Sequence, residues 1–600
     1  STVACRGLLC LPALVYLLIA AYWRVRNVDY LTGDETYYLI ISESLIDEGD
    51  VDVANNMQRR GWQAGWHESQ TIGRPHGWFS VHNVGLSALV AVPWGLGGTF
   101  GARLAMVACC GLAAPTVYRT INRVWRQPRG SLLLALALAL SMPLLDASSQ
   151  IYPDLPAGVL LLFAATCAAE GAERGPFEGW RALLFTAAVS MLPWLHIKYA
   201  AAALIAVAWR LDTTRRSAAW RLSTLWPPVA AIGSLASLAA YNVYAFGKMS
   251  GPYSEGSGLA LHLNAFIVFM GLHFDQAQGM FFEQPLWLLG VIGLAPMWRS
   301  ARRECLWWLI LYATAILPNA LHPNWYGGYS FVGRFGSTAV LLWSLPLAHG
   351  VKMLFGENLR LPAVLAAASL VLQAGLAALW LPANHGLFNQ GGRECLWAYN
   401  SLFPALLKNY LPYWLPYSQF WRYSANFGAL LFASGALACG WLWPRHPALA
   451  KRCFAGAALA AVAVVVLWPA RATSVAWSAE NLSRDIGRDE GELRVATEGR
   501  DARGMLAKSP ELFASRGRYQ VDVDYQAHGA ADYVGAVMLK DGQNLKLLSL
   551  LTPGRGELQH NESTTIVSRS DGDEPLAVFV WYEGRGSLSV ARLSVEKLSR

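Results

Sequence analysis

Apolar runs recur through about the first 470 of the 600 residues and constrain this chain more than any other feature. A helix needs about 20 apolar residues to cross a bilayer, and only helices and closed barrels satisfy their backbone groups in lipid. The runs begin at residue 8 and near residues 102, 131, 155, 181, 199, 226, 285, 305, 337, 361, 426 and 453. We therefore predict a polytopic α-helical membrane protein of about thirteen spans, some of them short or tilted. We expect the first run, residues 8–23, to remain as a helix and not to be a cleaved signal peptide.

The charged residues support this interpretation and set an orientation. Only 15% of residues are charged, and the net charge of +8 comes from short basic clusters between apolar runs. The clusters are Arg119, Arg123, Arg126 and Arg129; Arg210, Arg215, Arg216 and Arg221; Arg299, Arg302 and Arg303; and Arg445, Lys451 and Arg452. Because cytoplasmic loops are rich in Lys and Arg, these loops are expected inside, with the N-terminus inside and the C-terminus outside. The basic balance thus indicates topology and no nucleic-acid partner.

A long acidic segment follows the first run and reaches residue 101. Its stretch "VGLSALVAVPWGLGG" is too short and Gly-rich to span, which predicts a re-entrant or interfacial helix. The sequence has no internal repeat and few polar residues at mid-bilayer depth, so a transporter gains no support. Only one of nine cysteines lies in a long polar loop, which excludes a disulfide framework or a Cys-based metal site.

From about residue 471 the pattern changes to the alternation of β-strands. In "RYQVDVDYQ", Tyr519, Val521, Val523 and Tyr525 share one face. Similar stretches are "YVGAVML", "LKLLSLL", "STTIVS", "LAVFVWYE" and "SLSVARLSVE". We predict an extracytoplasmic β-sandwich or jelly roll over residues 471–600, following a membrane domain over 1–470. It would be a carbohydrate-binding or docking module, or a stabilising cap without a ligand.

Segments that combine carboxylate, imidazole, cation and aromatic groups all fall on the predicted outer side. They are "GDE" (33–35), "GRPHGWFSVHN" (73–83), "YPDLP" (152–156), "WLHIKY" (194–199), "HFDQ" (273–276) and "HPNWYGGYSFVGRF" (322–335). Chance placement would have scattered them over both faces. This convergence predicts a functional site at the outer surface of the membrane.

The acidic pair after the first run, the interfacial helix, about thirteen spans and an outer C-terminal domain resemble the GT-C superfamily. These are polyprenyl-phosphate-dependent glycosyltransferases, which include the aminoarabinose transferase of lipid A and the protein O-mannosyltransferases. The resemblance covers architecture along nearly the whole chain, whereas the motifs "GDE", "YPDLP" and "GGYSFVGRF" are short. It implies transfer of a sugar from a polyprenyl-phosphate donor to a glycan, lipid or protein acceptor. The transfer would take place with inversion, on the periplasmic side of a bacterial inner membrane.

The chemistry of such a transfer explains the residue types. An acceptor hydroxyl attacks the anomeric carbon through an oxocarbenium-like transition state, which requires a general base and cations for the leaving phosphate. By resemblance, Asp34 is the base, with Glu35 and Asp154 as supporting carboxylates. The substrate-binding candidates are Arg334, Lys198, His196, Arg74, His76, His82 and Tyr329. Asp34 and Asp154 are also candidate ligands of a divalent cation, Mg²⁺ or Mn²⁺.

Each candidate also has a purely structural interpretation. "TGDE" matches a capping box in which Glu35 reaches back to the backbone of Thr32. Asp154 could cap a helix, and Lys198 and Arg334 could extend to the headgroups. Two other functions stay open: an O-antigen-ligase or polymerase type of glycan transferase, which needs no acidic pair after the first helix, and a non-catalytic scaffold that displays the β-domain.

Overall fold

The structure is a computed structural model, and its description covers most of the chain. The described residues are 7–59, 70–170, 179–216, 222–252, 263–276, 278–322, 327, 330–382, 410–414, 424–467, 474–509, 517–541, 544–554, 557–567 and 576–598. The described residues form two compact units, the first before residue 468 and the second over residues 474–598. Each unit is described below by itself.

The first unit is helical and carries one short hairpin. Its helices up to residue 216 are α2 (Leu11–Val25), α3 (Glu35–Asp47), α4 (Ala54–Arg59), α5 (Val84–Gly111), α6 (Ala113–Trp125), α7 (Pro128–Ala139), α8 (Leu144–Ala147), α9 (Asp154–Ala169), α10 (Trp180–Leu195), the 3₁₀ turn η2 (Ile197–Tyr199) and α11 (Ala200–Arg216). The later ones are η3 (Leu222–Leu225), α12 (Trp226–Phe246), α13 (Leu263–Phe274), α14 (Met280–Glu283), η5 (Pro285–Trp287), α15 (Leu288–Ser300), α16 (Arg302–Ala320), α17 (Arg334–Val340), η6 (Leu341–Trp343), α18 (Ser344–Phe355), α19 (Arg360–Trp380), α20 (Ser424–Leu442) and α21 (Pro447–Leu467).

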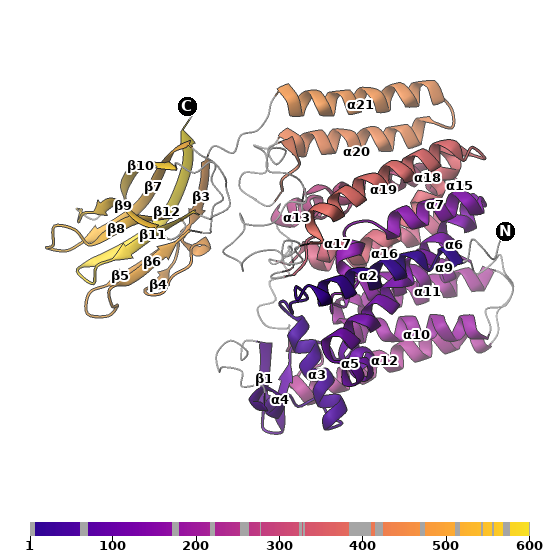
Figure 1. Cartoon of the computed structure of the whole chain (residues 1–600), viewed down its shortest axis with the longest axis horizontal. Helices are drawn as coiled ribbons and strands as arrows, with labels where there is room; N and C mark the ends of the chain where they lie inside the picture. Colours follow the sequence, from indigo (N-terminus) through magenta and orange to yellow (C-terminus); the bar gives the residue numbers. More distant parts are fainter. Residues whose placement is uncertain are drawn as a thin grey trace. The chain divides into compact units, whose positions relative to one another are not determined.

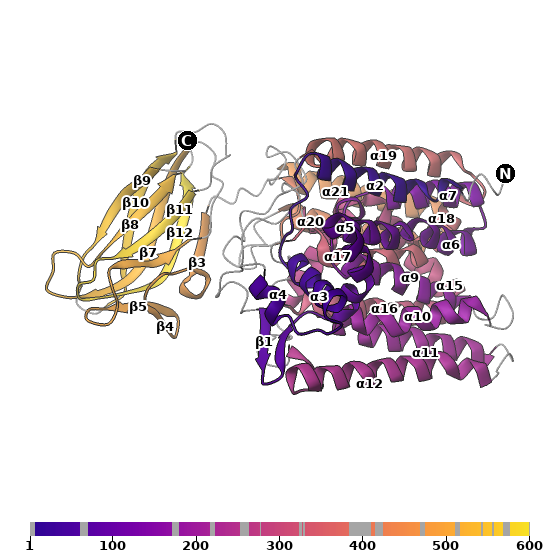
Figure 2. The same ribbon diagram turned by 60° about the horizontal axis from the view of Figure 1, so that its bottom comes forward.

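Helices lie at all thirteen positions at which we predicted spans, and how many of them cross the membrane stays a prediction. Six helical stretches of the described chain are long and apolar enough to cross a membrane: Val84–Trp125, Trp226–Phe246, Arg334–Phe355, Arg360–Leu379, Ser424–Leu442 and Pro447–Leu467. Five shorter apolar helices accompany them. Figures 1 and 2 show the long helices running alongside one another, with α3, α4 and β1 gathered at one end of the unit. The protein is therefore a polytopic helical membrane protein, as predicted.

The segment after α3 positions part of the site. Strands β1 (Thr71–Arg74) and β2 (Gly77–Ser80) form an antiparallel hairpin, and α5 begins four residues after β2. The backbone of Gly98 (φ 58°, ψ −146°) interrupts α5, so the part before Gly98 is a helical segment distinct from the part that continues toward α6. The helix predicted for this first part is confirmed, and its re-entrant or interfacial position stays a prediction.

The second unit consists of two antiparallel sheets. One has the order β10-β7-β12-β5-β4, with β3 also paired to β12, and the other has the order β6-β11-β8-β9. The strands are β3 (Ser474–Ser478), β4 (Arg488–Glu490), β5 (Leu493–Thr497), β6 (Gly504–Lys508), β7 (Gly517–His528), β8 (Gly535–Asp541), β9 (Asn544–Leu551), β10 (Gln559–Val567), β11 (Leu576–Tyr582) and β12 (Ser587–Leu598), with the 3₁₀ turn η10 (Ala479–Asn481) after β3.

The alternation predicted for β7 is confirmed. Tyr519, Val521, Val523 and Tyr525 are all buried and belong to a hydrophobic core that also includes residues of the other sheet, such as Val578. Because one face of β7 and one face of β11 enter the same core, the two sheets pack face to face as a sandwich. The predicted C-terminal β-domain is thus present, and all six quoted β-like stretches fall on strands.

Candidate active site

Asp154 lies at the centre of the polar cluster that the first unit buries. It is the first residue of α9, and its side chain is fully buried. Its Oδ1 accepts hydrogen bonds from Lys198 Nζ (2.7 Å) and from the hydroxyl of Tyr199 (2.7 Å). Its Oδ2 accepts from Arg334 Nε (2.9 Å). Two cations and a hydroxyl therefore satisfy a carboxylate that would otherwise be very costly to bury.

Arg334 joins Asp154 to Asp34. Arg334 Nη2 donates to Asp34 Oδ2 (3.0 Å), and Arg334 Nη1 donates to the carbonyl of Gly327 (3.3 Å). The guanidinium carbon lies 4.0 Å from the centre of the Tyr152 ring, which covers one face of the cation. A planar guanidinium fork is suited to bridging two carboxylates in this way. The structure thus brings together residues that lie up to 300 positions apart in the sequence.

Asp34 differs from the other two carboxylates because its side chain is 29% exposed, whereas those of Glu35 and Asp154 are fully buried. It precedes α3 and makes no side-chain capping bond there. Burial acts to raise the pKa of Asp34, but Arg334 and then His82 outweigh that effect, so the pKa lies below its usual value. Asp34 is consequently ionised at neutral pH and accessible to a proton donor.

His82 lies beside Asp34. Its Nε2 is 3.9 Å from Asp34 Oδ1 and has no hydrogen-bond partner among the described residues, although it is buried. The rings of Tyr37 and Tyr38 pack against the imidazole, with centroids at 5.4 and 5.0 Å. Burial lowers the pKa of His82, which the charge of Asp34 opposes. His82 is therefore neutral at pH 7 and presents a free nitrogen next to the exposed carboxylate.

Lys198 lies in η2, between α10 and α11, and His196 is the N-cap of η2. Lys198 Nζ also donates to Asn319 Oδ1 (3.2 Å) and lies 4.6 Å from the centre of the Phe335 ring. Burial acts to lower the pKa of Lys198, while Asp154 opposes the shift. His196 Nδ1 accepts from the Lys198 backbone (3.2 Å), and burial lowers the pKa of His196 to about 3. Lys198 thus adds a positive charge to the cluster, and His196 stabilises the turn that carries Lys198.

Local sequence explains why these segments meet. Pro153 is the N-cap of α9, where the missing amide proton of proline costs nothing. Gly333 is the N-cap of α17 in the left-handed region (φ 72°), so that α17 starts abruptly at Arg334. Within α9, a Cβ on Gly158 would lie 2.9 Å from the carbonyl oxygen of Thr338 in α17. The glycine allows the two helices to approach closely enough for Asp154 to reach Arg334.

Glu35 has structural partners on both oxygens. Its Oε2 accepts from the backbone of Thr32 (2.9 Å), as expected of a capping box. Its Oε1 accepts from the Ile151 backbone (2.9 Å) and from Arg103 (3.2 Å). Sequence analysis did not single out Arg103, although an arginine inside an apolar run is rare enough to have drawn attention.

Two other candidates, Arg74 and His76, have partners outside the cluster. His76 is exposed and contacts the carbonyl of Tyr244 through Nε2 (3.0 Å). The Arg74 guanidinium lies against the C-terminus of α12, where a Cβ on Gly247 would be 2.8 Å from it. The hairpin β1–β2 therefore directs both side chains toward α12 and away from Asp34. Tyr329 lies outside the described residues.

The cluster lies at the opposite end of α9 from the basic loops. Asp154 begins the helix, and Glu170, directly after its last residue, pairs with Arg119 and Arg181. Sixteen helical residues separate the two ends by about 24 Å, the scale of a bilayer core. Arg123 in turn pairs with Glu304 and donates to the carbonyl of Ala169, so basic residues that were expected in loops lie on helices at that far end, Arg119 and Arg123 on α6 among them.

The residues do not fit a metal ion shared by Asp34 and Asp154. The guanidinium of Arg334 bonds to both carboxylates, and Lys198 and Tyr199 take the other oxygen of Asp154. A divalent cation would have to displace these groups to reach oxygen ligands. Side-chain cations thus occupy the carboxylate oxygens that a shared metal ion would need.

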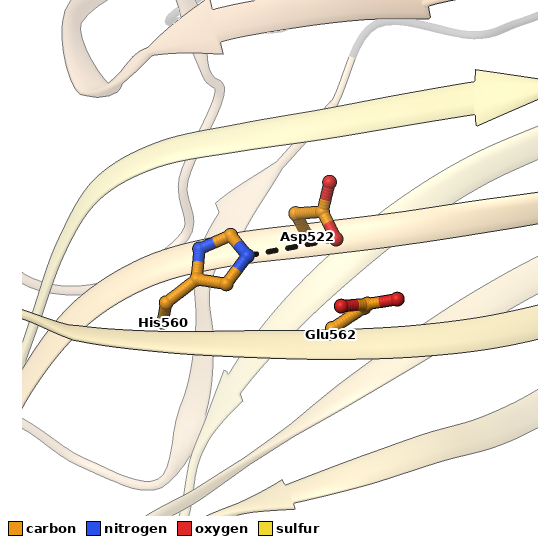
Figure 3. Close-up of side chains that lie close together, drawn as sticks. All are labelled: Asp522, His560 and Glu562. Carbon is orange, nitrogen blue, oxygen red and sulfur yellow. Dashed lines mark ion pairs between the residues drawn. The ribbon is translucent and has the colours of Figure 1, made fainter.

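The β-domain holds one further group of potential ligands among the described residues: Asp522, His560 and Glu562, whose ligand atoms lie within 4.8 Å of one another. Figure 3 shows the three side chains on neighbouring strands β7 and β10, with His560 turned toward Asp522. His560 also pairs with Asp524 (2.6 Å), and more than half of its side chain is exposed. We interpret this group as a solvated, charge-paired face of the sheet.

Comparisons with known proteins give fold likenesses only. No protein-family model matches the chain, and no curated protein matches it. It is similar to the crystal structure of ArnT from Cupriavidus metallidurans bound to undecaprenyl phosphate, with 15% identity, a TM-score of 0.39 and coverage of 78% of this chain and 77% of that one. It is also similar to the crystal structure of ArnT from Cupriavidus metallidurans in the apo state, with 18% identity, a TM-score of 0.37 and coverage of 77% of this chain and 77% of that one.

Two carbohydrate-binding modules match a shorter part of the chain. The C-terminal CBM6 of LamC from Zobellia galactanivorans has 15% identity and a TM-score of 0.16, covering 21% of this chain and 99% of the module. The module CBM6cm-2 of Cellvibrio mixtus lichenase 5A, in complex with cellotriose, has 12% identity and a TM-score of 0.14, covering 21% and 98%. At these values the likenesses decide nothing about function, which depends on the site itself.

Proposed function

We propose that this chain is an inverting membrane glycosyltransferase that uses a polyprenyl-phosphate sugar and acts on the extracytoplasmic side. One observation carries the proposal: a partly exposed, ionised carboxylate, Asp34, is held by the cation Arg334 at the end of the helices opposite the basic loops. The positive-inside rule assigns the basic end to the cytoplasm and the Asp34 end to the outer face.

The chemistry follows from these two groups. The acceptor hydroxyl donates its proton to Asp34 as its oxygen forms a bond to the anomeric carbon. The bond from that carbon to the phosphate oxygen breaks, and the polyprenyl phosphate leaves with the electron pair. Arg334, which lies between Asp34 and Asp154, and Lys198, which is paired with Asp154, stabilise the charge that develops on the phosphate. Attack and departure on opposite sides of the carbon give inversion.

Asp154 is assigned the role of holding the cations in place. Both of its oxygens are occupied and it is fully buried, so it has no free position for a substrate proton. His82, with an unpartnered Nε2 near Asp34, is assigned to bind the donor or the acceptor. Carbohydrate binding by the β-domain stays a prediction.

The test is release of undecaprenyl phosphate from membrane-extracted lipid-linked sugars by the purified protein in proteoliposomes, followed by mass spectrometry. We expect Asp34→Asn to lower release by about 10²-fold or more, the scale of a lost general base. Asp47→Asn makes the same chemical change at the exposed, opposite end of α3 and should leave release unchanged. Equal release by wild type and Asp34→Asn would favour a ligase without an acidic base, and no release by any protein would favour a scaffold.

A further inference from the structure

Arg103 is a buried cation that the proposed reaction does not use. It lies in α5, within the longest apolar helical stretch, and none of its surface is exposed. An ionisable group inside a membrane span is costly and persists only with strong partners. Its surroundings therefore reveal what it stabilises.

The partners of Arg103 belong to two loops that lie far apart in the sequence. One terminal nitrogen donates to the carbonyls of Asp29 (3.2 Å) and Tyr30 (3.0 Å), before α3. The other donates to the carbonyl of Ser149 (3.0 Å) and to the side chain of Gln150 (3.4 Å), before α9. A single guanidinium thus fastens the loop that leads to Asp34 to the loop that leads to Asp154.

Glu35 makes the same connection from the other side. Glu35 Oε1 pairs with Arg103 and also accepts a hydrogen bond from the backbone N–H of Ile151. Glu35 Oε2 accepts a hydrogen bond from the backbone N–H of Thr32. The hydroxyl of Tyr152 adds a third link by donating to the carbonyl of Thr32 (2.7 Å). The two loops are therefore cross-linked one residue from Asp34 and two residues from Asp154.

We propose that Arg103, paired with Glu35, is a positioning residue that holds these two loops at the separation that lets Arg334 bridge Asp34 and Asp154. The inference deepens the proposed function and depends on it for its catalytic consequence. The geometric consequence, coupling of the two loops, stands independently. Misplacing a catalytic group by about 1 Å can cost about 10²-fold in rate, so a loosened pair should lower kcat more than it changes KM.

Hydrogen exchange measured by mass spectrometry on the full-length protein tests the coupling. In Arg103→Lys, which keeps the charge but not the guanidinium fork, we expect amides of residues 28–36 and 148–155 to exchange about tenfold faster together. Arg119→Lys is the matched control, because Arg119 pairs with the buried Glu170 at the far end of α9. It should leave both segments unchanged.

Activity supplies the second measurement. Arg103→Lys and Glu35→Gln should each lower kcat about 10- to 100-fold and leave KM for the donor within about threefold. Should Arg103→Lys not fold, Glu35→Gln gives the same test at constant side-chain volume. Unchanged exchange in both loops would overturn the inference. Faster exchange in a protein whose wild type transfers no sugar would overturn the proposed function and leave the coupling intact.

Discussion

Two aspartates bind the same arginine and yet differ in what they can do. Asp154 is fully buried with each oxygen occupied, whereas Asp34 retains an oxygen that faces His82 at 3.9 Å, too far for a hydrogen bond. A buried, saturated carboxylate sets the position of cations, and an exposed one exchanges protons with a substrate. The division of roles therefore follows from exposure and hydrogen bonding, not from residue type.

The charge of Arg334 should determine the pH at which activity is lost on acidification. Arg334 lowers the pKa of Asp34 against the effect of burial, so the acidic limb of kcat/KM should lie below the usual range for aspartate. Arg334→Gln removes the positive charge that opposes the effect of burial on Asp34. The pKa of Asp34 should therefore rise and move the acidic limb to higher pH. The pH profile of residual transfer measures this. Arg299→Gln, a change at an exposed position near Trp441, should not move the limb.

Glu283 is a buried carboxyl for which the structure gives no partner. Neither oxygen has a hydrogen bond among the described residues, and a Cβ on Gly333 would lie 2.6 Å from one of them. Burial, followed by the charges of Asp146 and Asp275, raises the pKa of Glu283 well above its usual value. The folded protein therefore favours the protonated form of Glu283.

We expect Glu283→Gln to raise the Tm, and more at pH 8 than at pH 5. A raised folded-state pKa contributes stability that is full below the unfolded-state pKa and is lost as pH rises through the folded-state pKa. The amide of the variant cannot ionise, so the variant avoids this loss. We expect its free energy of unfolding to rise by about 1–3 kcal/mol. Thermal unfolding in detergent at the two pH values measures it. A lower Tm at both would show that the carboxylate holds an unidentified cationic partner.

At the scale of elements, the contact between α9 and α17 brings the two halves of the cluster together. Asp154 begins one helix and Arg334 the other, and Thr338 Oγ1 donates to the carbonyl of Asp154 (2.8 Å). Gly158 lies one turn into α9, against the α17 backbone. Helices that pack at glycine approach more closely than larger side chains allow.

Gly158→Leu should therefore separate α9 from α17. Overpacking costs about 1–3 kcal/mol and displaces backbone, so we expect a lower Tm and a loss of transfer of at least about tenfold. Gly375→Leu is the matched control, because nothing lies within 4 Å of a Cβ at that position in α19. Transfer and Tm of the two variants should be measured side by side. Full activity in Gly158→Leu would mean that the helix contact does not set the site.

At the scale of the whole molecule, the chain consists of two units with separate interiors. The β-unit has its own hydrophobic core, in which residues such as Val523 and Val580 are fully buried. A domain with its own core can in principle fold alone. Among the described residues, the members of that core all lie between Trp477 and Val595.

A fragment of residues 470–600 should fold without the membrane unit. We expect a soluble protein with a cooperative thermal transition in circular dichroism. Val523→Asp should abolish the transition, because it places an unpaired charge in the core, whereas Asp522→Asn, on the opposite face of β7, should not. A fragment that unfolds without cooperativity would show that the domain depends on the rest of the chain.

The sequence alone predicted the apolar helices, strands β7 to β12 and most of the members of the candidate site, but not strands β1 to β6 or the short helices α4, α8 and α14. Apolar runs predicted the helices, and alternation predicted β7 through β12, because bilayer thickness and sheet pleating each impose a period that one sequence displays. Residue type, a shared membrane side and the resemblance to the GT-C superfamily predicted Asp34, Asp154, Lys198 and Arg334. These properties are local, or follow from topology alone.

Only the tertiary structure decided which of these groups touch. Arg334 contacts carboxylates 180 and 300 residues away, and no period in the sequence encodes such a distance. The sequence likewise does not reveal the partners of Arg103, because they include backbone carbonyls, which every residue has. Nor does it reveal that the hairpin directs Arg74 and His76 toward α12. Backbone direction and helix packing fix these contacts, since a charged side chain inside the fold bonds to whatever the packing places beside it.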